Sequence, residues 1–426
     1  MELAAQDYCA SVRDGTHDSP KQSNTGKKLI TSRHIIGGRI DLENAYLISD
    51  SDFAEINRRS KVDQWDVLIT MIGTVGEPCL VSEVPDFAIK NIGLFKSRSK
   101  LHGQWLYYYL KSPATQALIR AKTSGTTQAY VPLGTLRLLP IMAPESEAET
   151  EAIASCLSAL DDKIELNRRM NETLEAMARA LFKDWFVDFG PTRAKRERRE
   201  PYLASELWAL FPDRMDEKGK PEGWQDVPFS DLLSIIGGGT PKTSVDMYWG
   251  DSIPWFSVVD TPPTGSVFVI DTEKSITEAG LENSSARLVP VGTTIISARG
   301  TVGNLAVTGK PMTFNQSCYG LRGADPVGDY FVYLAAQQVV GRLQAMAHGS
   351  VFSTITRQTF DSATFARPHA QLLQSFETYV APMFHRILSG VQESRTLAQT
   401  RDLLLPKLMS GEIRVRDAER VVEAML

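Results

Sequence analysis

Two stretches of the chain place apolar residues at alternating steps of four and three. The first runs from Ile153 to Trp185, and the same stepping recurs 223 residues later, from Phe376 to Leu408. This spacing predicts two long helices, each with a narrow apolar seam of the coiled-coil kind. The seam positions are Ile153, Leu157, Leu160, Ile164, Asn167, Asn171, Leu174, Ala178, Leu181 and Trp185, then Phe376, Val380, Met383, Ile387, Gly390, Ser394, Leu397, Arg401, Leu404 and Leu408.

The two seams lose apolar character at equivalent positions, Asn167 and Asn171 in the first and Gly390 and Ser394 in the second. Because the stepping and its interruptions match, we expect the helices to pack against each other, with the polar patch setting the register. The alternative is that each helix packs only on its own domain. As a helix, the first seam would span roughly 50 Å.

Two prolines complicate the second helix. Pro382 stands where the first copy has Ala159. We therefore expect the second helix to kink at Pro382 or to begin there, with the proline in its first turn. Pro406 is expected to end the helix or bend it again.

The remainder of the chain is duplicated as well. Gly15-Thr16 recurs as Gly239-Thr240, and the string Gly-Thr-Val-Gly occurs at 73–76 and again at 300–303. A chain with two such halves can present two similar surfaces. This favours recognition of a target that itself has two parts.

Strand and helix patterns around these repeats also match. Strand-like runs at 66–70 and 77–81 flank the first Gly-Thr-Val-Gly string like a hairpin, and a similar run at 293–297 precedes the second. Helices are predicted over 105–121 and 329–347. Both blocks are therefore expected to be α/β or α+β, without the alternation typical of dinucleotide-binding folds.

These patterns divide the chain into five segments. We expect a first globular block at 1–144, a heptad helix at 145–189, a linker at 190–223, a second globular block at 224–368, and a heptad helix with a tail at 369–426. The linker crowds five basic residues into seven positions, namely Arg193, Lys195, Arg196, Arg198 and Arg199. This run is either a solvated linker or a contact for phosphate or for a partner.

Composition narrows the class of protein. Of 426 residues, 42% are hydrophobic and 23% are charged, and the four cysteines form no CxxC pair. The pattern shows neither a membrane-spanning run nor the apolar core of a signal peptide, so a cytoplasmic protein is expected. The net charge is −5, and only the block at 1–144 is basic, at +3. If the chain grips a phosphate backbone, much of the counter-charge must come from a partner.

No catalytic motif is evident. The sequence contains neither a GxxxxGK[ST] phosphate loop nor an HExxH metal pattern. The string Asp260-Thr-Pro-Pro-Thr264 is faintly similar to the catalytic loop of amino-methyltransferases, but it offers no aromatic residue to stack a flipped base. We therefore expect a protein that is not an enzyme and holds no metal.

A series of short strings recurs in a set order along the chain: Arg13–Pro20, Leu160–Asn167, Leu181–Phe189, Leu210–Pro212, Pro221–Trp224, Gly237–Pro241, Tyr248–Gly250, Ile253–Trp255 and Leu404–Ile413. Taken in this order, the strings resemble those of the specificity subunit of type I restriction–modification systems.

The resemblance implies two duplicated target-recognition domains of α/β (α+β) fold, joined by two long antiparallel coiled-coil helices about a pseudo-twofold axis. Each domain would bind one half-site of double-stranded DNA, and the helices would set the distance between them. Two methyltransferase subunits would dock on the helical region, and restriction subunits could join them. S-adenosylmethionine and ATP would bind those partners, and this chain would hold no cofactor.

Base recognition needs hydrogen-bonding side chains on loops. In the first block the candidates are Thr16, His17, Lys21, Lys27, Lys28, Arg58, Arg59, Lys61, Thr126, Thr127 and Gln128. In the second block they are Thr240, Lys242, Thr243, Arg299, Ser350, Ser353, Thr354 and Arg357. Because the blocks differ in sequence, we expect two unlike half-sites about one helical turn apart.

Two other functions stay open. The weak basic charge also suits a protein-interaction scaffold that has no role on DNA. An enzyme that both recognises and methylates its target would need cofactor motifs, which the sequence does not display.

Overall fold

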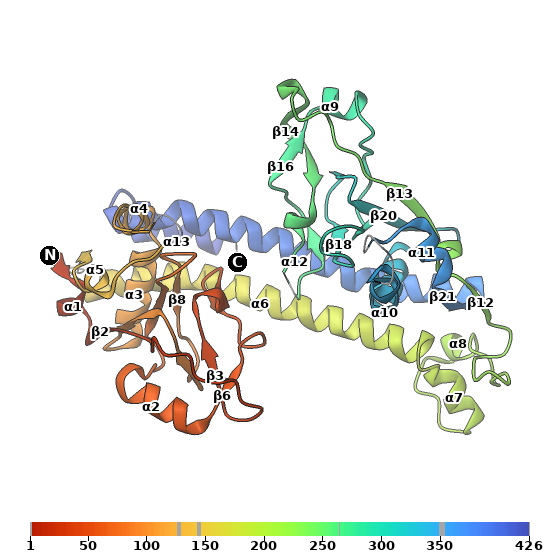
Figure 1. The fold of residues 1–426 in the computed structure, drawn as a ribbon, viewed down its shortest axis with the longest axis horizontal. Helices are drawn as coiled ribbons and strands as arrows, with labels where there is room; N and C mark the ends of the chain where they lie inside the picture. Colours follow the sequence, from red (N-terminus) through yellow and green to blue (C-terminus); the bar gives the residue numbers. More distant parts are fainter. Residues whose placement is uncertain (1, 126–128, 143–145, 264, 349–353, 426) are drawn as a thin grey trace. The chain divides into compact units, whose positions relative to one another are not determined.

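The computed structural model describes residues 2–125, 129–142, 146–263, 265–348 and 354–425 (Figure 1). The chain forms two compact units. Unit 1 comprises residues 1–164 and 396–426, and unit 2 comprises residues 165–395. Two long helices, α6 (Glu147–Phe186) and α12 (Ala370–Ser410), each contribute residues to both units.

Unit 1 is built around two small sheets. The first is antiparallel, with the order β2 (Ser11–Asp14), β10 (Ile92–Lys96), β7 (Val67–Thr70) and β8 (Pro78–Leu80). The second has the order β6 (Leu47–Ile48), β3 (Lys27–Ile30) and β9 (Phe87–Ile89), with β3 and β9 parallel. Two strand pairs complete the unit: β1 (Glu2–Ala4) with β11 (Pro140–Met142), and β4 (Ile35–Ile36) with β5 (Arg39–Ile40). The β7–β8 pairing confirms the predicted hairpin around 73–76.

The helix predicted over 105–121 is two helices, α3 (Lys100–Lys111) and α4 (Pro113–Ala121). Ser112 lies between them with an extended backbone, ψ 144°, because the residue before a proline is disfavoured in helical conformation. Its hydroxyl caps α4, and Pro113 starts that helix. The remaining helices of unit 1 are α1 (Ala5–Tyr8), η1 (Ser32–His34), α2 (Asp50–Ser60), α5 (Leu133–Arg137) and α13 (Val415–Glu423).

Unit 2 repeats the sheet order. Its main sheet runs β13 (Leu233–Gly237), β20 (Cys318–Gly323), β17 (Thr294–Ser297), β18 (Leu305–Thr308) and β15 (Phe268–Val269). A second sheet has the order β16 (Lys274–Ile276), β14 (Trp249–Phe256) and β19 (Thr313–Phe314), and β12 (Gln225–Pro228) pairs with β21 (Thr364–Arg367). The run β13-β20-β17-β18 matches β2-β10-β7-β8, which confirms the duplicated mixed α/β fold.

One long helix of unit 2 is unbroken where unit 1 has two shorter helices. Helix α10 (Asp329–His348) is continuous, as predicted, where unit 1 has the broken pair α3 and α4. The other helices are α7 (Gly190–Arg196), α8 (Ser205–Trp208), η2 (Phe229–Leu232), η3 (Asp246–Tyr248), η4 (Val258–Asp260), α9 (Glu278–Glu282) and α11 (Arg357–Ser362).

The segment 190–223 is not a solvated linker. Leu207 and Phe211 are buried in the main hydrophobic cluster of unit 2, and Ala194 is fully buried. Lys195 donates from its ammonium group to the Phe211 carbonyl at 2.6 Å and lies 2.9 Å from the Asp213 carboxylate. Apolar side chains at these positions bury surface that a solvated linker would leave in water.

Helix α12 begins at Ala370 and passes through Pro382 and Pro406 before ending at Ser410. Of the alternatives expected for the two prolines, a start at Pro382 and an end at Pro406 are therefore excluded, while a kink at Pro382 and a bend at Pro406 stay predictions. Pro382 is exposed. A proline on the solvent side of a helix leaves its freed carbonyl where water can bind it, so the helix can continue.

Within each unit, α6 and α12 pack antiparallel. In unit 1 Asp161 pairs with Arg401. In unit 2 the Asn167 amide donates to Glu393 at 2.8 Å, and the rings of Trp185 and Phe376 lie 5.3 Å apart. As residue numbers rise along α6, the numbers of their contact partners fall along α12. This antiparallel series of contacts confirms that the long helices pair with each other.

The polar patch of the seam lies in unit 2 and is tightly packed. A Cβ atom added to Gly390 would meet the Asn171 side-chain oxygen at 2.7 Å. Asn167 and Asn171 are both buried, and the side-chain oxygen of each has no hydrogen-bond partner in the described part of the chain. A buried polar atom without a hydrogen-bond partner lowers stability. The pairing of the two helices is therefore sensitive to substitution at Asn167 and Asn171.

The ends of the long helices enter different hydrophobic clusters. In unit 2, Phe182, Trp185 and Phe186 of α6 pack with Phe331 and Phe376. In unit 1, α6 and α12 contribute mostly leucines to the cluster, among them Leu157, Leu160, Leu405 and Leu408.

The four cysteines, Cys9, Cys79, Cys156 and Cys318, are all buried thiols. Burial raises the pKa of Cys9, Cys79 and Cys318 to about 12 and that of Cys156 to about 11. No helix in the described ranges has the length and apolar character needed to cross a membrane.

Candidate nucleic-acid interface

Several turns of unit 1 meet at one edge of its sheets, which we call edge 1 (residues 15–17, 31–33, 72–76, 90–91 and 129–130). The Gly73 amide donates to the Ala129 carbonyl at 3.0 Å, and the Asn91 amide donates to the Thr16 carbonyl at 3.2 Å. The Ser32 hydroxyl donates to the Asn91 carbonyl at 3.2 Å. These turns surround a shallow hollow of about 350 Å³, lined by Thr31, Ser32, Arg33, Ile72, Gly73, Thr74 and Asn91.

Local sequence explains these turns. Gly73 and Gly76 adopt φ values of 80° and 91°, which glycine reaches without steric cost. Thr31 caps the short turn Ser32–His34 through a reciprocal capping box with His34. Edge 1 is thus a set of turns fixed by backbone hydrogen bonds and caps.

Unit 2 builds the same arrangement, which we call edge 2 (residues 239–240, 257–260, 298–303, 315–317 and 354–357). The Ile355 amide donates to the Ala298 carbonyl at 3.0 Å, just as the Val131 amide donates to the Met71 carbonyl at 2.9 Å. The Asn315 amide donates to the Phe256 carbonyl at 2.9 Å, as Lys90 does to Ile30 at 2.8 Å.

The caps and glycines of edge 2 match those of edge 1. Ser257 caps the turn Val258–Asp260 in a capping box equivalent to that of Thr31. Gly300 and Gly303 have φ values of 75° and 91°. The two edges therefore share a backbone and differ in the side chains that it presents.

One polar pair recurs at both edges. At edge 1 the His17 ring lies 2.9 Å from the side-chain amide of Asn91. At edge 2 the Thr240 hydroxyl bonds to the side-chain amide of Gln316. In each case a residue from the segment after β2 or β13 contacts the oxygen of an amide side chain.

The charged side chains of the two edges stand at different positions. Arg33 lines the hollow of edge 1, whereas the equivalent residue of the second capped turn is Val259, which is 73% exposed. Lys90 of edge 1 has Asn315 as its equivalent in edge 2. Edge 2 in turn carries Arg299 and Arg357, so each edge has two arginine or lysine residues, at positions that are not equivalent.

Two predicted residues of unit 1, His17 and Arg59, contact a buried carboxylate, and a third, Thr16, lies beside them. Asp14, 3% exposed, accepts from the guanidinium of Arg59 and lies 3.0 Å from the His17 ring. Thr16 forms a bridge to Lys90 and accepts from the Asp18 amide through its hydroxyl. Thr16, His17 and Arg59 therefore belong to one network that borders edge 1.

Most other basic candidates of unit 1 are held by local partners. Lys27 lies 2.8 Å from Asp86, Lys61 lies 2.9 Å from Asp63, and Arg58 lies 2.5 Å from Glu55. Hydrogen bonds to these carboxylates raise the pKa of Lys27 and of Lys61. Lys28 donates to the Ala45 carbonyl at 2.8 Å, whereas Lys21 is exposed. Thr126, Thr127 and Gln128 lie outside the described residues.

The candidates of unit 2 are more dispersed. Thr240, Arg299 and Arg357 lie at edge 2, and the Arg357 guanidinium donates to the Ile235 carbonyl at 3.1 Å. Thr354 is half-buried beside Ile355, while Lys242 and Thr243 are exposed in the segment that leads away from Thr240. Ser350 and Ser353 lie outside the described residues.

Sequence reasoning missed Arg33, Asn91 and Gln316. A signal for the last two was present, because polar pairs separate two strand-like runs at 90–91 and 315–316, at nearly the spacing of the repeat. Arg33 had no comparable signal, since its counterpart is an apolar valine.

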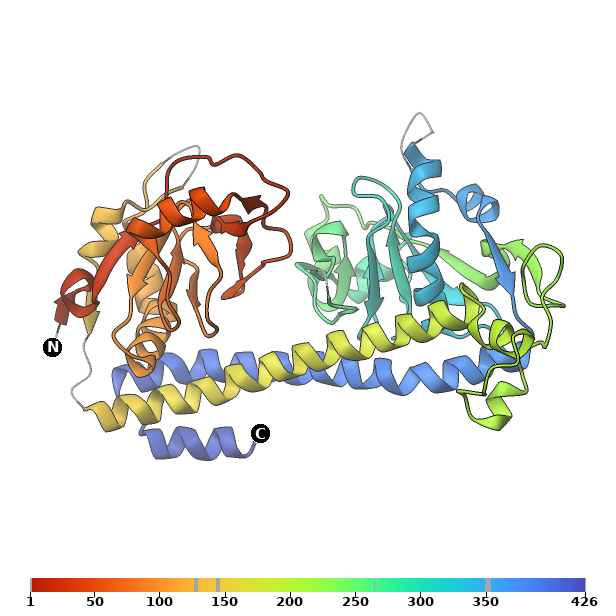
Figure 2. The same cartoon turned by 90° about the horizontal axis from the view of Figure 1, so that it is seen from below.

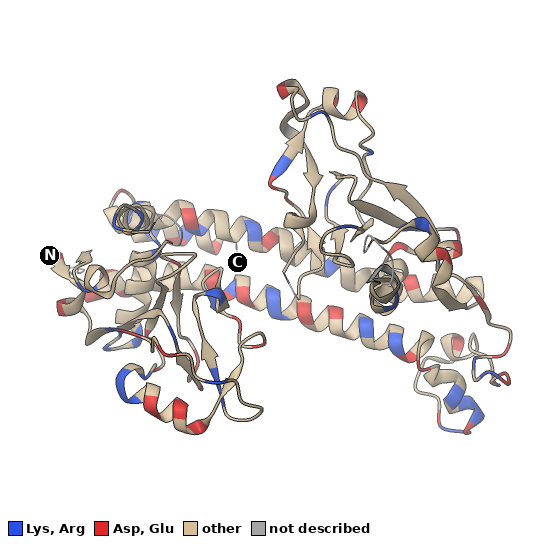
Figure 3. Ribbon diagram, viewed as in Figure 1, with Lys and Arg blue, Asp and Glu red and all other residues tan. Residues whose placement is uncertain are grey.

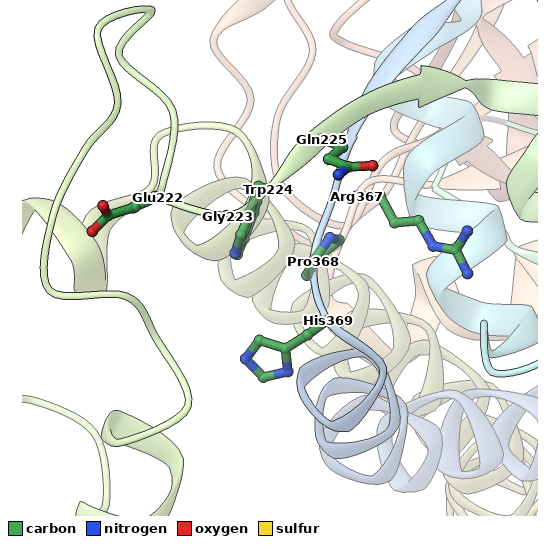
Figure 4. Close-up of a pocket in the computed structure, with 7 residues that line it drawn as sticks. All are labelled: Glu222, Gly223, Trp224, Gln225, Arg367, Pro368 and His369. Atoms are coloured by element: carbon green, nitrogen blue, oxygen red, sulfur yellow. The ribbon is translucent and has the colours of Figure 1, made fainter.

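A second hollow, of about 470 Å³, lies in unit 2 (Figure 4). It is formed by residues 222–225, at and just after the end of the segment 190–223, and by residues 367–369, just before α12. Its lining residues are Glu222, Gly223, Trp224, Gln225, Arg367, Pro368 and His369, none of which belongs to edge 2. His369 is engaged with the Leu210 carbonyl at 2.7 Å. Across the described ranges no cluster of three or more His, Cys, Asp or Glu side chains is suited to hold a metal ion.

The family model for the type I restriction modification DNA specificity domain matches the chain twice, over residues 22–176 and 221–372. The chain belongs to this family. It is similar to the type I restriction enzyme HindI specificity subunit of Haemophilus influenzae, with 29% identity over 357 residues that cover 73% of this chain and 77% of the relative. It is also similar to the MjaIX specificity subunit of Methanocaldococcus jannaschii, with 26% identity, covering 74% of this chain and 70% of the relative.

Structural comparison agrees on the fold. The crystal structure of the type I restriction–modification S subunit from M. genitalium superposes with a TM-score of 0.56 at 15% identity, covering 96% of this chain and 95% of that one. The chain is thus a specificity subunit: a non-catalytic component that determines the DNA sequence on which a type I system acts. The expected family and function are confirmed.

Proposed function

We propose that this specificity subunit recognises a bipartite, asymmetric site in double-stranded DNA, with edge 1 contacting one half-site and edge 2 the other. The observation that carries the proposal is the repetition of one set of turns with different side chains. Equal backbones can approach equivalent parts of a groove, while unequal side chains select different bases. The predicted segments 1–144 and 224–368 would be the two recognition domains.

Asn91 and Gln316 are the residues that we assign to base contact. Amide side chains offer both a donor and an acceptor, and each good pairing with a base discriminates by about 1–3 kcal/mol. Arg33 adds a guanidinium to edge 1, a group suited to the acceptors of guanine. The His17–Arg59–Asp14 network would support edge 1 and offer further cationic groups to phosphates.

The long helices are the proposed docking region for two methyltransferase subunits, with restriction subunits as further partners. Exposed apolar side chains on their outer faces support this. Leu166 and Met177 of α6 are 55% and 49% exposed in unit 2, and Leu403 of α12 is 68% exposed in unit 1. S-adenosylmethionine and ATP would bind the partner subunits, and the assembly would act in the cytoplasm.

Selection from randomised DNA tests the proposal, using the complex of this chain with the methyltransferase subunit of its type I system. The expected result is two short, unlike motifs separated by unselected bases. Asn91→Ala should relax one motif and Gln316→Ala the other, each lowering affinity for the selected site by about 10- to 100-fold. Lys61→Ala, which removes a lysine paired with Asp63, is the matched control and should change affinity less than about twofold.

Two outcomes would contradict the proposal. If both variants relax the same motif, the two edges do not act on separate half-sites. If the assembled complex shows no sequence preference at all, the chain acts as a scaffold for other proteins.

A further inference from the structure

Edge 1 and edge 2 each place one arginine and one apolar residue at the same two turns, but in reversed order. The first turn is the one with the capping box, and its middle residue is Arg33 in unit 1 and Val259 in unit 2. The second turn is the Gly-Thr-Val-Gly string, and the residue that opens it is Ile72 in unit 1 and Arg299 in unit 2. The arginine has therefore changed turn between the two copies.

The exchanged residues belong to one hollow. Arg33 and Ile72 both line the hollow of edge 1, together with Asn91, which is assigned to base contact. The backbone hydrogen bonds that hold the two turns in place have the same pattern in unit 2. Each edge thus offers a ligand one guanidinium and one apolar side chain, from exchanged turns.

Val259 is held at the surface by its turn. It is 73% exposed, whereas its neighbour Val258 packs against a buried cluster. The Ser257 amide donates to one oxygen of the Asp260 carboxylate at 2.7 Å, and the Glu273 amide donates to the other oxygen at 2.7 Å. The carboxylate is therefore engaged by backbone amides. What the turn presents is the methyl surface of a stiff, β-branched side chain, which loses little entropy when it is bound.

Arg299 has no competing partner in the described part of the chain. Its side chain is exposed, and no ion pair or hydrogen bond engages it within the described ranges. Charge is also sparse nearby, since the described strands of the main sheet of unit 2 carry a single charged residue, Arg322, which pairs with Asp329 (Figure 3). Arg299 is thus a cation of edge 2 that can meet a base.

The turn opened by Arg299 lies where a duplex can approach it. In unit 2 the turn 298–303 joins β17 to β18 at the end of the sheet that is remote from the long helices (Figure 2). Val291, which precedes β17, stands at the opposite end of that strand. The two ends of one strand therefore provide a test position and a control position.

We propose that Val259 contacts the 5-methyl group of a thymine in the half-site of edge 2, at the position where Arg33 contacts a guanine in the half-site of edge 1. Arg299 then supplies a guanine contact of edge 2 from the neighbouring turn. In the major groove thymine alone among the four bases presents a methyl group, and guanine presents two acceptors that suit a guanidinium. This inference rests on the proposed function and names bases that the two edges select.

The test measures binding of the selected DNA by the complex of this chain with the methyltransferase subunit of its type I system. Replacing each thymine of both half-sites in turn by deoxyuridine removes only the methyl group. At one position this should weaken binding about three- to fivefold, the factor for one buried methyl group. In Val259→Ala the same replacement should change binding by less than about 1.5-fold, because the contact is already lost.

Exchange of residues across the repeat gives a change of specificity that misfolding cannot produce. In a renewed selection, Val259→Arg should replace the thymine at that position by guanine. Arg33→Val should remove a guanine from the other half-site, with a loss of discrimination of about tenfold or more. Arg299→Ala should relax a guanine in the same half-site that Val259→Arg alters.

The matched controls are Val291→Ala and Val291→Arg, at a valine of unit 2 that is 39% exposed. Both variants should leave the selected motifs unchanged and should change the affinity less than about twofold.

Each failure has its own result. A site with two motifs in which no thymine methyl group affects binding would overturn the inference and leave the proposed function intact, as would a methyl effect that persists in Val259→Ala. An equal loss of affinity for all sequences in Val259→Ala would overturn it in favour of a contact with the sugar–phosphate backbone. A wild-type complex without sequence preference would instead refute the proposed function itself.

Discussion

Units 1 and 2 attach equivalent helices to α6 through an equivalent tyrosine but different carboxylates. The Tyr108 hydroxyl of α3 donates to Asp161 at 3.0 Å, and the Tyr333 hydroxyl of α10 donates to Glu175 at 3.0 Å. The position equivalent to Asp161 in the second long helix is Phe384, whose ring lies 5.7 Å from that of Tyr333. The attachment has therefore persisted in both copies while the residue that accepts it has moved.

The charges around these carboxylates have changed as well. Asp161 is paired with Arg401, whose counterpart in the first long helix is Ala178. Glu175 is instead approached by Arg179 at 2.5 Å. A duplicated backbone thus tolerates independent exchange of side chains, and this is the same behaviour that gives edge 1 and edge 2 their different chemistry.

The largest expected difference between the units is in their hydrophobic clusters. Phe182 and Leu405 occupy equivalent positions of the two long helices, and both are almost fully buried. Phe182→Ala should lower the free energy of unfolding by about 4 kcal/mol and Leu405→Ala by about 3 kcal/mol, since the larger side chain leaves the larger cavity. Denaturant titration and hydrogen exchange resolved by unit would measure both effects. Met177→Ala, at an exposed position, is the control, and a cost above about 0.5 kcal/mol there would show that the method does not isolate burial.

A smaller difference is expected for the two tyrosine hydroxyls. Tyr333→Phe and Tyr108→Phe should each cost on the order of 1 kcal/mol of unfolding free energy, because a buried carboxylate loses one donor. The cost should be greater for Tyr333, since the Glu175 side chain is 6% exposed and that of Asp161 is 25% exposed. Equilibrium unfolding of both variants measures this order, and a reversed order would mean that Arg401 and not solvent access determines the cost.

The smallest expected effect is a difference in the response to pH. His34 and His102 of unit 1 are buried or half-buried, whereas His369 and His385 of unit 2 are exposed. Burial lowers the pKa of His34, with Arg33 adding to the shift, and burial lowers that of His102. Each ring is therefore neutral in the folded state at a pH where the unfolded chain takes up a proton, so stability is lost as the pH falls below about 6.5.

Protection against hydrogen exchange at pH 7.5 and 5.5 would measure this response. Protection in β7 and β10 should fall more than in β17 and β20, and His102→Gln should reduce the difference. Burial raises the pKa of Asp66 in unit 1 and of Glu377 in unit 2, so carboxylates do not by themselves favour either unit. An equal loss of protection in both units would refute the assignment to the histidines.

Periodic patterns made the long helices and the duplication predictable. The heptad stepping was a dependable signal because residues of one seam contact the other long helix, as Asn167 contacts Glu393 and Trp185 contacts Phe376. The break between α3 and α4 was also visible in Pro113, but an apolar stripe across 105–121 concealed it. The sequence left open whether α12 begins at Pro382 or continues through it, because the effect of a proline on a helix depends on whether the residue faces solvent.

The interface was less predictable, because it depends on contacts between distant residues. His17 meets Asn91, and Arg59 meets Asp14, only once the strands between them have folded. Several lysines chosen for their charge, such as Lys27 and Lys61, prove to be paired with nearby carboxylates. Composition cannot distinguish a lysine that is free to meet phosphate from one that already has a partner.

The burial of all four cysteines has a practical consequence. Because only a thiolate reacts readily with alkylating dyes, thiols with a pKa of about 11 to 12 are nearly silent at neutral pH. A cysteine introduced at Thr74 or Thr301, in the matched Gly-Thr-Val-Gly turns, would then be the principal site of labelling. Energy transfer between fluorophores at these two positions could follow the separation of the two turns on and off DNA, without first removing any native cysteine.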